Sequence, residues 1–125
     1  MKFREGNYAL YCEGDNTELC RIVKVCSTGT YKVVFNDGNI WLTKDVRRVP
    51  INECDIERLG FSLYSKSSSY WRYRTTSETD DEGDVLTKYS TSKTYWVYEN
   101  LPSSTCVSVR YIHEVQNLME VLNDL

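Results

Sequence analysis

Hydrophobic and polar positions alternate in short runs along the first fifty residues. Between residues 19 and 26, for example, Cys20 and Ile22 fall on one face while Arg21 and Val23 fall on the other. Alternation with a period of two indicates a half-buried β-strand. Clusters of turn residues separate these runs. The sequence therefore predicts strands over residues 7–12, 19–26, 31–35, 40–42 and 45–49.

The turns between these runs favour a small closed sheet. Asp37-Gly38 is the strongest hairpin signal in the chain, and Pro50 marks the point where a central strand should stop. Five short strands with tight turns and no helix predict an SH3-like or Tudor-like β-barrel over residues 1–50, because closure removes exposed sheet edges. The phrase Val33–Gly38 also resembles the central hairpin of Tudor-like barrels.

The middle of the chain begins with a short helix, predicted over residues 52–59. Asn52 is a suitable N-cap, and Gly60 is placed to end the helix. Further β-rich runs then predict a sheet of about four antiparallel strands. The charge run Thr79–Asp84 is expected to be a solvated loop, since it lacks the spacing of a calcium loop. The β-rich runs cover residues 61–64, 70–74, 85–89, 95–99 and 105–111.

The last segment has the periodicity of a helix. Apolar residues recur there at spacings of three and four, which is typical of an amphipathic helix. The apolar stripe comprises Ile112, Val115, Leu118, Met119 and Leu122. We expect the stripe to pack on the sheet; a docking surface for a partner is the alternative. Residues 51–125 then form an antiparallel sheet with a C-terminal helix, as a second domain or as part of one compact unit. The fold class is then α+β.

Composition and charge limit the class of protein. The chain has 125 residues, of which 41% are hydrophobic, so it forms one domain or two very small ones. Ten Tyr and three Trp against three Phe favour half-exposed strands and binding faces, since Tyr and Trp carry a polar group. A net charge of −3 disfavours bulk electrostatic binding of nucleic acid but permits a local basic patch.

The cysteines indicate a reducing environment. Their number is odd and no Cys-x-x-Cys pair occurs, which disfavours a zinc module and a disulfide scaffold. They are Cys12, Cys20, Cys26, Cys54 and Cys106. The N-terminal residues lack the apolar core of a signal peptide, and no stretch is apolar enough to cross a membrane. We therefore expect a cytoplasmic protein without a membrane partner.

The only histidine of the chain stands in a pair, His113-Glu114, that begins like the helix of a zinc protease. Such a site needs a second His four residues after the first, and Asn117 occupies that position. The sequence also lacks a Gly-rich phosphate loop and a clear nucleophile–base pair. We expect a non-enzymatic protein without catalytic residues, metal or cofactor, in which His113 and Glu114 are structural residues at a strand-to-helix junction.

Aromatic and basic side chains are combined in the strand predicted over residues 70–74. This is the chemistry of single-strand binding, in which rings stack on bases and Arg contacts phosphate. Trp71 and Tyr73, however, fall on the face opposite Arg72 and Arg74. The simpler interpretation therefore places these rings inward and the arginines outward.

The aromatic residues of the predicted barrel allow two interpretations. In the simpler interpretation these residues form the core of the barrel. In the other they form a cage for a methylated cation. They are Tyr8, Tyr11, Tyr31, Phe35 and Trp41. A candidate interaction surface for the whole chain comprises Tyr70, Arg72, Arg74 and Trp41.

Two phrases resemble parts of small uncharacterised proteins from gut Bacteroidetes-type bacteria and their tailed phages. Val46–Ile51 followed by Ile56–Phe61 is similar to a boundary in those proteins, where a Pro-Ile-Pro-Leu phrase precedes a short helix ending in Leu-Gly-Phe. Tyr111–Leu118 resembles their terminal Tyr-x-His-Glu-Leu-Gln-Asn-Leu phrase, with Val115 in place of Leu. The resemblance implies a phage or prophage context in a host bacterial cytosol, and it implies no activity.

Together these observations favour a non-enzymatic phage accessory protein that binds a host or viral protein. Inhibition of a host defence system would suit a small acidic protein in that context. The alternative is a module that binds single-stranded nucleic acid through the strand at residues 70–74. The sequence does not indicate an oligomeric state.

Overall fold

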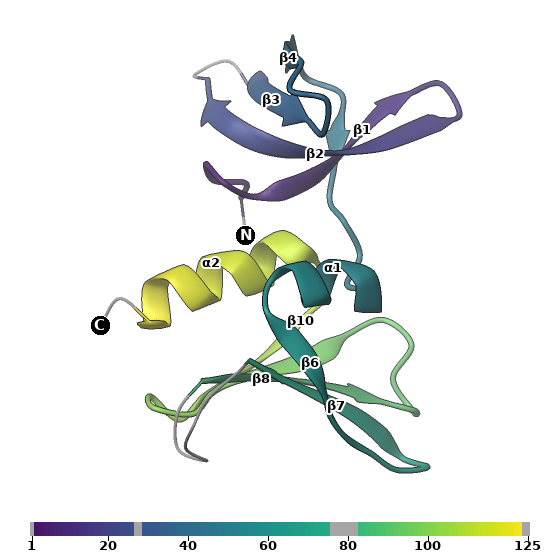
Figure 1. Cartoon of the computed structure of the whole chain (residues 1–125), viewed down its shortest axis with the longest axis vertical. Coiled ribbons are helices and arrows are strands. Elements are labelled where there is room, and N and C mark those ends of the chain that lie inside the picture. The colour runs from purple at the N-terminus through teal and green to yellow at the C-terminus, as the bar shows by residue number, and fades with distance from the viewer. Residues whose placement is uncertain (1, 27–28, 76–82, 124–125) are drawn as a thin grey trace. The chain divides into compact units, whose positions relative to one another are not determined.

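The computed structural model describes residues 2–26, 29–75 and 83–123 of the chain (Figure 1). Its contacts divide the chain into two compact units. Unit 1 comprises Met1–Pro50 and Tyr111–His113, and unit 2 comprises Ile51–Arg110 and Glu114–Leu125. The sequence predicts one boundary, after residue 50, and gives no sign that residues 111–113 return to unit 1.

Unit 1 is a five-stranded antiparallel sheet that curves into a half-barrel (Figure 1). Its strands are β1 (Tyr8–Glu13), β2 (Asn16–Val25), β3 (Tyr31–Phe35), β4 (Ile40–Thr43) and β5 (Val46–Arg47). They are hydrogen-bonded in the order β4-β3-β2-β1-β5. All five expected strands are present, and β2 begins earlier than predicted because a tight turn with Gly14 at φ 59° brings Glu13 opposite Asn16.

The expected closure of this sheet is not found. In the described part of the chain, β4 pairs with β3 and β5 pairs with β1, but no pairing joins β4 to β5. The two-residue length of β5 gives it too few backbone groups to close a ladder. The sheet therefore has two edges, and β4 exposes Ile40, Trp41 and Leu42 at one of them.

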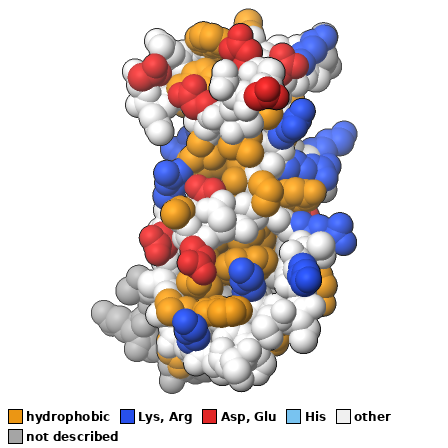
Figure 2. All heavy atoms as spheres, turned by 90° about the vertical axis from the view of Figure 1, so that its right-hand side faces the viewer, with side chains coloured by type: hydrophobic (Ala, Val, Ile, Leu, Met, Phe, Trp, Pro, Cys, Tyr) orange, Lys and Arg blue, Asp and Glu red, His pale blue; other side chains and the backbone are white. Residues whose placement is uncertain are grey.

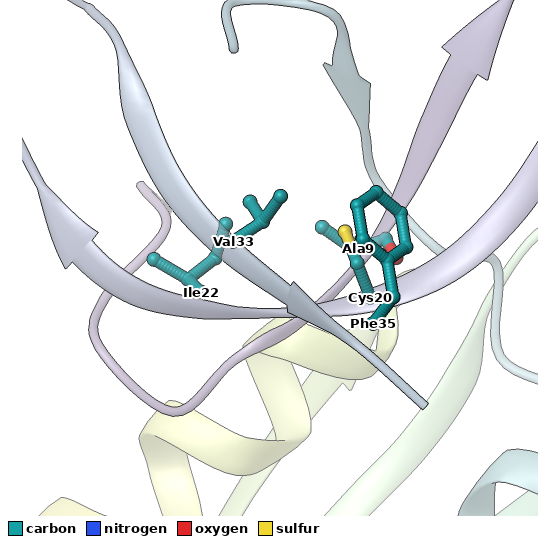
Figure 3. Close-up of a cluster of buried hydrophobic side chains, with 5 residues drawn as sticks. All are labelled: Ala9, Cys20, Ile22, Val33 and Phe35. Atoms are coloured by element: carbon teal, nitrogen blue, oxygen red, sulfur yellow. Dashed lines mark hydrogen bonds between the residues drawn. The ribbon is translucent and has the colours of Figure 1, made fainter. Parts of the chain in front are cut away.

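Alternate side chains of β1, β2 and β3 build the core of unit 1 (Figure 3). The core residues are Ala9, Cys20, Ile22, Val33 and Phe35. The Cys20 thiol donates to the carbonyl oxygen of Ala9 at 3.4 Å. Burial raises the pKa of this thiol to about 11, so it stays protonated and acts as a small hydrophobic residue rather than a nucleophile.

Unit 2 combines a second antiparallel sheet with two helices. The helices are α1 (Glu53–Arg58) and α2 (Ile112–Asn123), the first two residues of which belong to unit 1. The strands are β6 (Phe61–Lys66), β7 (Tyr70–Thr75), β8 (Asp84–Tyr89), β9 (Trp96–Asn100) and β10 (Thr105–Val109). They pair in sequence order, so the sheet has five strands where about four were expected. The fold class is α+β, as the sequence predicts.

The predicted N-cap of α1 is present, whereas the C-cap is Leu59, one residue before the predicted Gly60. The Asn52 side chain accepts a hydrogen bond from the backbone N–H of Asp55 at 2.9 Å. Gly60 follows the helix with φ 97°, a left-handed conformation that favours glycine. We expect Asn52→Ala to lower the free energy of unfolding by about 1 kcal/mol, because one N–H at the helix start loses its acceptor. Urea denaturation would measure this loss, and Asn52→Ser, which keeps an uncharged acceptor, should recover most of it.

One face of the unit 2 sheet is buried and includes a polar network centred on Asp84. The Tyr98 hydroxyl and Asn100 Nδ2, the latter at 3.0 Å, donate to Asp84 Oδ1. Asn123 Nδ2, at the end of α2, donates to Asp84 Oδ2 at 3.1 Å. Asp84 is only 3% exposed, so the expectation of a solvated run is wrong at this residue. The other charged residues of that run, 80–82, lie outside the described residues.

Helix α2 buries more of its surface than the apolar stripe indicates. Ile112 and Val115 of the stripe are fully buried, but so are His113 and Asn117, which fall outside it. His113 is buried in part because the Phe3 ring lies against it, with ring centroids 4.7 Å apart. Within residues 2–26, 29–75 and 83–123, no helix is long and apolar enough to cross a membrane.

Candidate binding site

Strand β7 presents different side chains on its two faces. Tyr73 is 4% exposed, and its hydroxyl donates to a Glu53 carboxylate oxygen of α1 at 2.9 Å. Burial, followed by the hydrogen bond and charge of Glu53, raises the pKa of Tyr73 to about 12. Arg72 and Arg74 alternate with Tyr73 and therefore point to the opposite face, which is the arrangement that the sequence favours.

Each arginine stacks on a tyrosine on that opposite face. The guanidinium carbon of Arg72 lies 5.1 Å from the ring centroid of Tyr70, and that of Arg74 lies 5.6 Å from the ring centroid of Tyr64. Both distances are within the range of a cation–π interaction. We refer to Tyr64, Tyr70, Arg72 and Arg74 as the arginine–tyrosine face.

Tyr64 reaches this face through an irregularity in β6. The pairing register between β6 and β7 shifts between Leu63 and Ser65, as in a β-bulge. A bulge adds a residue to one strand and redirects a side chain. Tyr64 is 61% exposed, so its ring is available to a ligand as well as to Arg74.

The arginine–tyrosine face borders a pocket of about 270 Å³. The pocket is lined by Tyr64, Arg72, Arg74, Val85, Glu99 and Leu101. Arg74, Val85 and Glu99 stand opposite one another on β7, β8 and β9, so they form a row across the sheet. Val85 is 7% exposed and supplies an apolar floor between the two charges.

Arg72 retains unused hydrogen-bonding capacity. Its Nε atom is buried, and no acceptor for it is found among the residues that the structure describes. A buried donor without a partner is costly, typically about 1–3 kcal/mol. Arg72 and Arg74 both line the pocket, and their positive charges make it suited to an anionic group.

The other face of β7 carries a second group of cations and rings. Trp71 lies between Lys66, at 5.8 Å, and Lys88, at 5.6 Å, measured from each Nζ to the ring centroid. Lys88 Nζ also lies 5.7 Å from the ring centroid of Trp96. Figure 2 shows a face of the molecule on which Lys and Arg side chains lie among hydrophobic ones.

The structure brings together three of the four residues of the predicted interaction surface. Tyr70, Arg72 and Arg74 share the arginine–tyrosine face, whereas Trp41 belongs to unit 1. Trp41 is 49% exposed and packs edge-to-face on Tyr11 and Phe35. Tyr64 was not predicted as part of the surface, and its neighbours in the sequence, Leu63 and Ser65, give no basic or aromatic signal.

His113 and Glu114 lie at the start of α2 and make local contacts. A Glu114 carboxylate oxygen accepts a hydrogen bond from the backbone N–H of Arg110 at 2.9 Å, in the manner of a helix cap. The His113 ring contacts those of Phe3 and Tyr111, at centroid distances of 4.7 and 6.0 Å. No group of three or more His, Cys, Asp or Glu side chains that could hold a metal is found in the described ranges.

Fold and site together define a small α+β protein with a shallow pocket of basic, aromatic and apolar side chains. Comparison with protein-family models, with curated proteins and with solved structures finds no match to this chain. The chemistry of the pocket is therefore the basis for a functional proposal.

Proposed function

We propose that the chain is a non-enzymatic binding protein that holds an acidic segment of a partner protein against the arginine–tyrosine face. The observation that carries this proposal is the pair of stacked arginines at the edge of a pocket, Arg72 on Tyr70 and Arg74 on Tyr64. A guanidinium donates two parallel hydrogen bonds to a carboxylate, so both arginines are suited to Asp or Glu side chains.

Stacking supports the proposal because it restrains the arginines before a ligand arrives. A guanidinium lying on a ring keeps its N–H groups at its edge, where they can reach an acceptor. Restraint in the free protein lowers the entropy cost of binding. Tyr and Arg are also the residue types that contribute most often to protein–protein hot spots.

The size and lining of the pocket favour a single acidic side chain over an extended polyanion. The volume of about 270 Å³ is below the usual range for drug-sized ligands. Val85 and Leu101 would contact the aliphatic part of a Glu side chain.

The remaining parts of the proposal concern fold family and context. The five short antiparallel strands and half-barrel curvature of unit 1 support an SH3-like or Tudor-like arrangement of strands, without the closure of a barrel. The resemblance of Tyr111–Leu118 to a phrase in small proteins of gut Bacteroidetes-type bacteria and their tailed phages supports a phage or prophage accessory role in the host cytoplasm. Inhibition of a host defence system is one such role. A pull-down from host lysate that retains no protein at micromolar concentration would count against this context.

The first test uses the double variant Arg72→Ala, Arg74→Ala. We expect its dissociation constant for a hexaglutamate peptide, measured by isothermal titration calorimetry, to rise about tenfold or more, since two charge-assisted interactions are lost. Lys66→Ala, Lys88→Ala removes the same charge from the other face of the sheet and is the matched control. An equal loss in both variants would show that only net charge matters and would refute the site.

A second candidate, single-stranded nucleic acid, is favoured by the presence of Tyr64 and Tyr70 on the same face as the arginines. Stacking of bases on exposed rings beside Arg is the chemistry of single-strand binding. An oligo-dT strand should then bind with a salt-dependent affinity, and Arg72→Ala, Arg74→Ala should reduce that dependence. Tighter binding of oligo-dT than of hexaglutamate at the same ionic strength would favour this candidate over an acidic protein segment.

A further inference from the structure

A second hollow lies on the hairpin formed by β1 and β2 in unit 1. Its volume is about 260 Å³. It is lined by Tyr11, Glu13, Asn16, Thr17 and Glu18. The pairing register sets Tyr11 opposite Glu18 and Glu13 opposite Asn16, so these four side chains share one face of the hairpin. The hollow is part of neither the arginine–tyrosine face nor its pocket.

Tyr11 forms a fixed aromatic wall for this hollow. Its ring contacts Phe35 at a centroid distance of 5.5 Å and Trp41 at 5.6 Å, with interplanar angles of 86° and 81°. Phe35 and Trp41 also contact each other, at 5.7 Å. These are edge-to-face contacts between packed rings, so a methylated cation has no room between them. The hollow instead lies beside Tyr11, outside the ring cluster.

The charge around this wall is negative. Glu13 and Glu18 are exposed, and among the residues that the structure describes no Lys or Arg lines the hollow. Partial desolvation, followed by the charges of Glu13 and Asp45, raises the pKa of Tyr11. Figure 2 shows acidic side chains gathered around hydrophobic ones at the top of the view, where the unit 1 strands lie.

We propose that this hollow binds a Lys or Arg side chain from a basic segment of a partner protein. The aliphatic part of such a side chain would lie on the Tyr11 ring, which also attracts its cation. Glu13 and Glu18 would accept its hydrogen bonds. The volume accommodates one long side chain rather than a folded ligand. The proposal does not depend on the arginine–tyrosine face, whose ligand has the opposite charge.

The test measures binding of a tetralysine peptide to the full chain by NMR titration. We expect the peptide to shift the amide signals of Tyr11 and Glu18 most strongly. Glu13→Gln, Glu18→Gln should weaken binding roughly five- to tenfold, as expected for the loss of two exposed ion pairs. The matched control, Glu5→Gln, Asp15→Asn, removes the same charge from exposed positions of unit 1 outside the lining and should keep most of the affinity.

Two results would overturn the proposal. One is an equal loss of affinity in the two double variants, which would mean that tetralysine responds to net charge alone. The other is a set of shifts centred away from Tyr11 and Glu18. Thermal unfolding would verify that each variant is folded, with Glu18→Gln alone as the replacement if the double variant is not. Arg72→Ala, Arg74→Ala should leave tetralysine binding intact, so failure here and failure of the proposed function are distinguishable.

Discussion

Replacing Asp84 with alanine is expected to lower the free energy of unfolding by about 3–5 kcal/mol. The carboxylate is buried and accepts hydrogen bonds from Tyr98, Asn100 and Asn123. Removing it leaves these three donors facing a cavity without an acceptor, and each buried donor then bears its full desolvation cost. Urea denaturation followed by circular dichroism would measure the loss.

Two further variants determine whether the network is the cause. Asn123→Ala removes the donor to Asp84 and the acceptor of an Asn100 N–H at the end of α2, and it should cost about 1–2 kcal/mol. Glu99→Ala removes an exposed carboxylate from the neighbouring strand β9 and should change stability by less than about 0.5 kcal/mol. If Asp84→Ala costs no more than Glu99→Ala, the network contributes nothing to stability.

The stability of the chain is expected to fall steeply as the pH rises above 9. Burial raises the pKa of Cys20 from 9.0 to about 11. Burial and the Glu53 hydrogen bond raise the pKa of Tyr73 from 10.0 to about 12. Burial and the Asp84 hydrogen bond raise that of Tyr98 further still.

The direction of this change in stability depends on whether the folded or the unfolded chain binds these protons more tightly. Each of these groups binds its proton more strongly in the folded chain than in the unfolded chain. The contribution of each group to the free energy of unfolding is therefore complete below the pKa of the unfolded chain and is lost as the pH rises toward the pKa of the folded chain. The loss is up to about 1.4 kcal/mol per pH unit for each group. The window runs from pH 9 to 11 for Cys20 and from pH 10 to 12 for Tyr73.

Denaturation at a series of pH values would measure this profile. Tyr73→Phe should be slightly less stable than the unchanged chain at pH 7, because the bond to Glu53 is lost, yet its stability should decline less between pH 10 and 12. A decline parallel to that of the unchanged chain would contradict the role of Tyr73. Cys20→Ala should likewise flatten the profile between pH 9 and 11.

Much of the fold could be predicted because local patterns agree with it. Strict alternation identified β2, the Asp37-Gly38 turn identified the β3–β4 hairpin, and Asn52 and Gly60 identified the ends of α1. Closure could not be predicted in this way. It depends on whether β5 is long enough to reach β4, and a two-residue strand leaves little trace in a hydrophobic pattern.

The candidate site was only partly predictable. Alternation along β7 correctly placed Arg72 and Arg74 opposite Tyr73, because side-chain direction within a strand has a period of two. The contribution of Tyr64 depends on a register shift between β6 and β7, and a bulge has no reliable sequence signal. Asp84 was misassigned for a related reason, since its donors Tyr98, Asn100 and Asn123 are distant in sequence.

The return of residues 111–113 to unit 1 has a consequence for synthesis and for dissection of the chain. Val49 accepts a hydrogen bond from Ile112 at 2.8 Å, and Pro50 pairs with Tyr111. The chain thus passes from one unit to the other at three points, after residues 50, 110 and 113. Beside the first two of these points, the backbone N–H of Ile51 donates a hydrogen bond to the carbonyl oxygen of Arg110 at 3.1 Å. On the ribosome, residues 1–50 must wait for nearly the whole chain before unit 1 is complete. A fragment cut after residue 50 lacks its last segment, whereas residues 51–110 have adjacent ends.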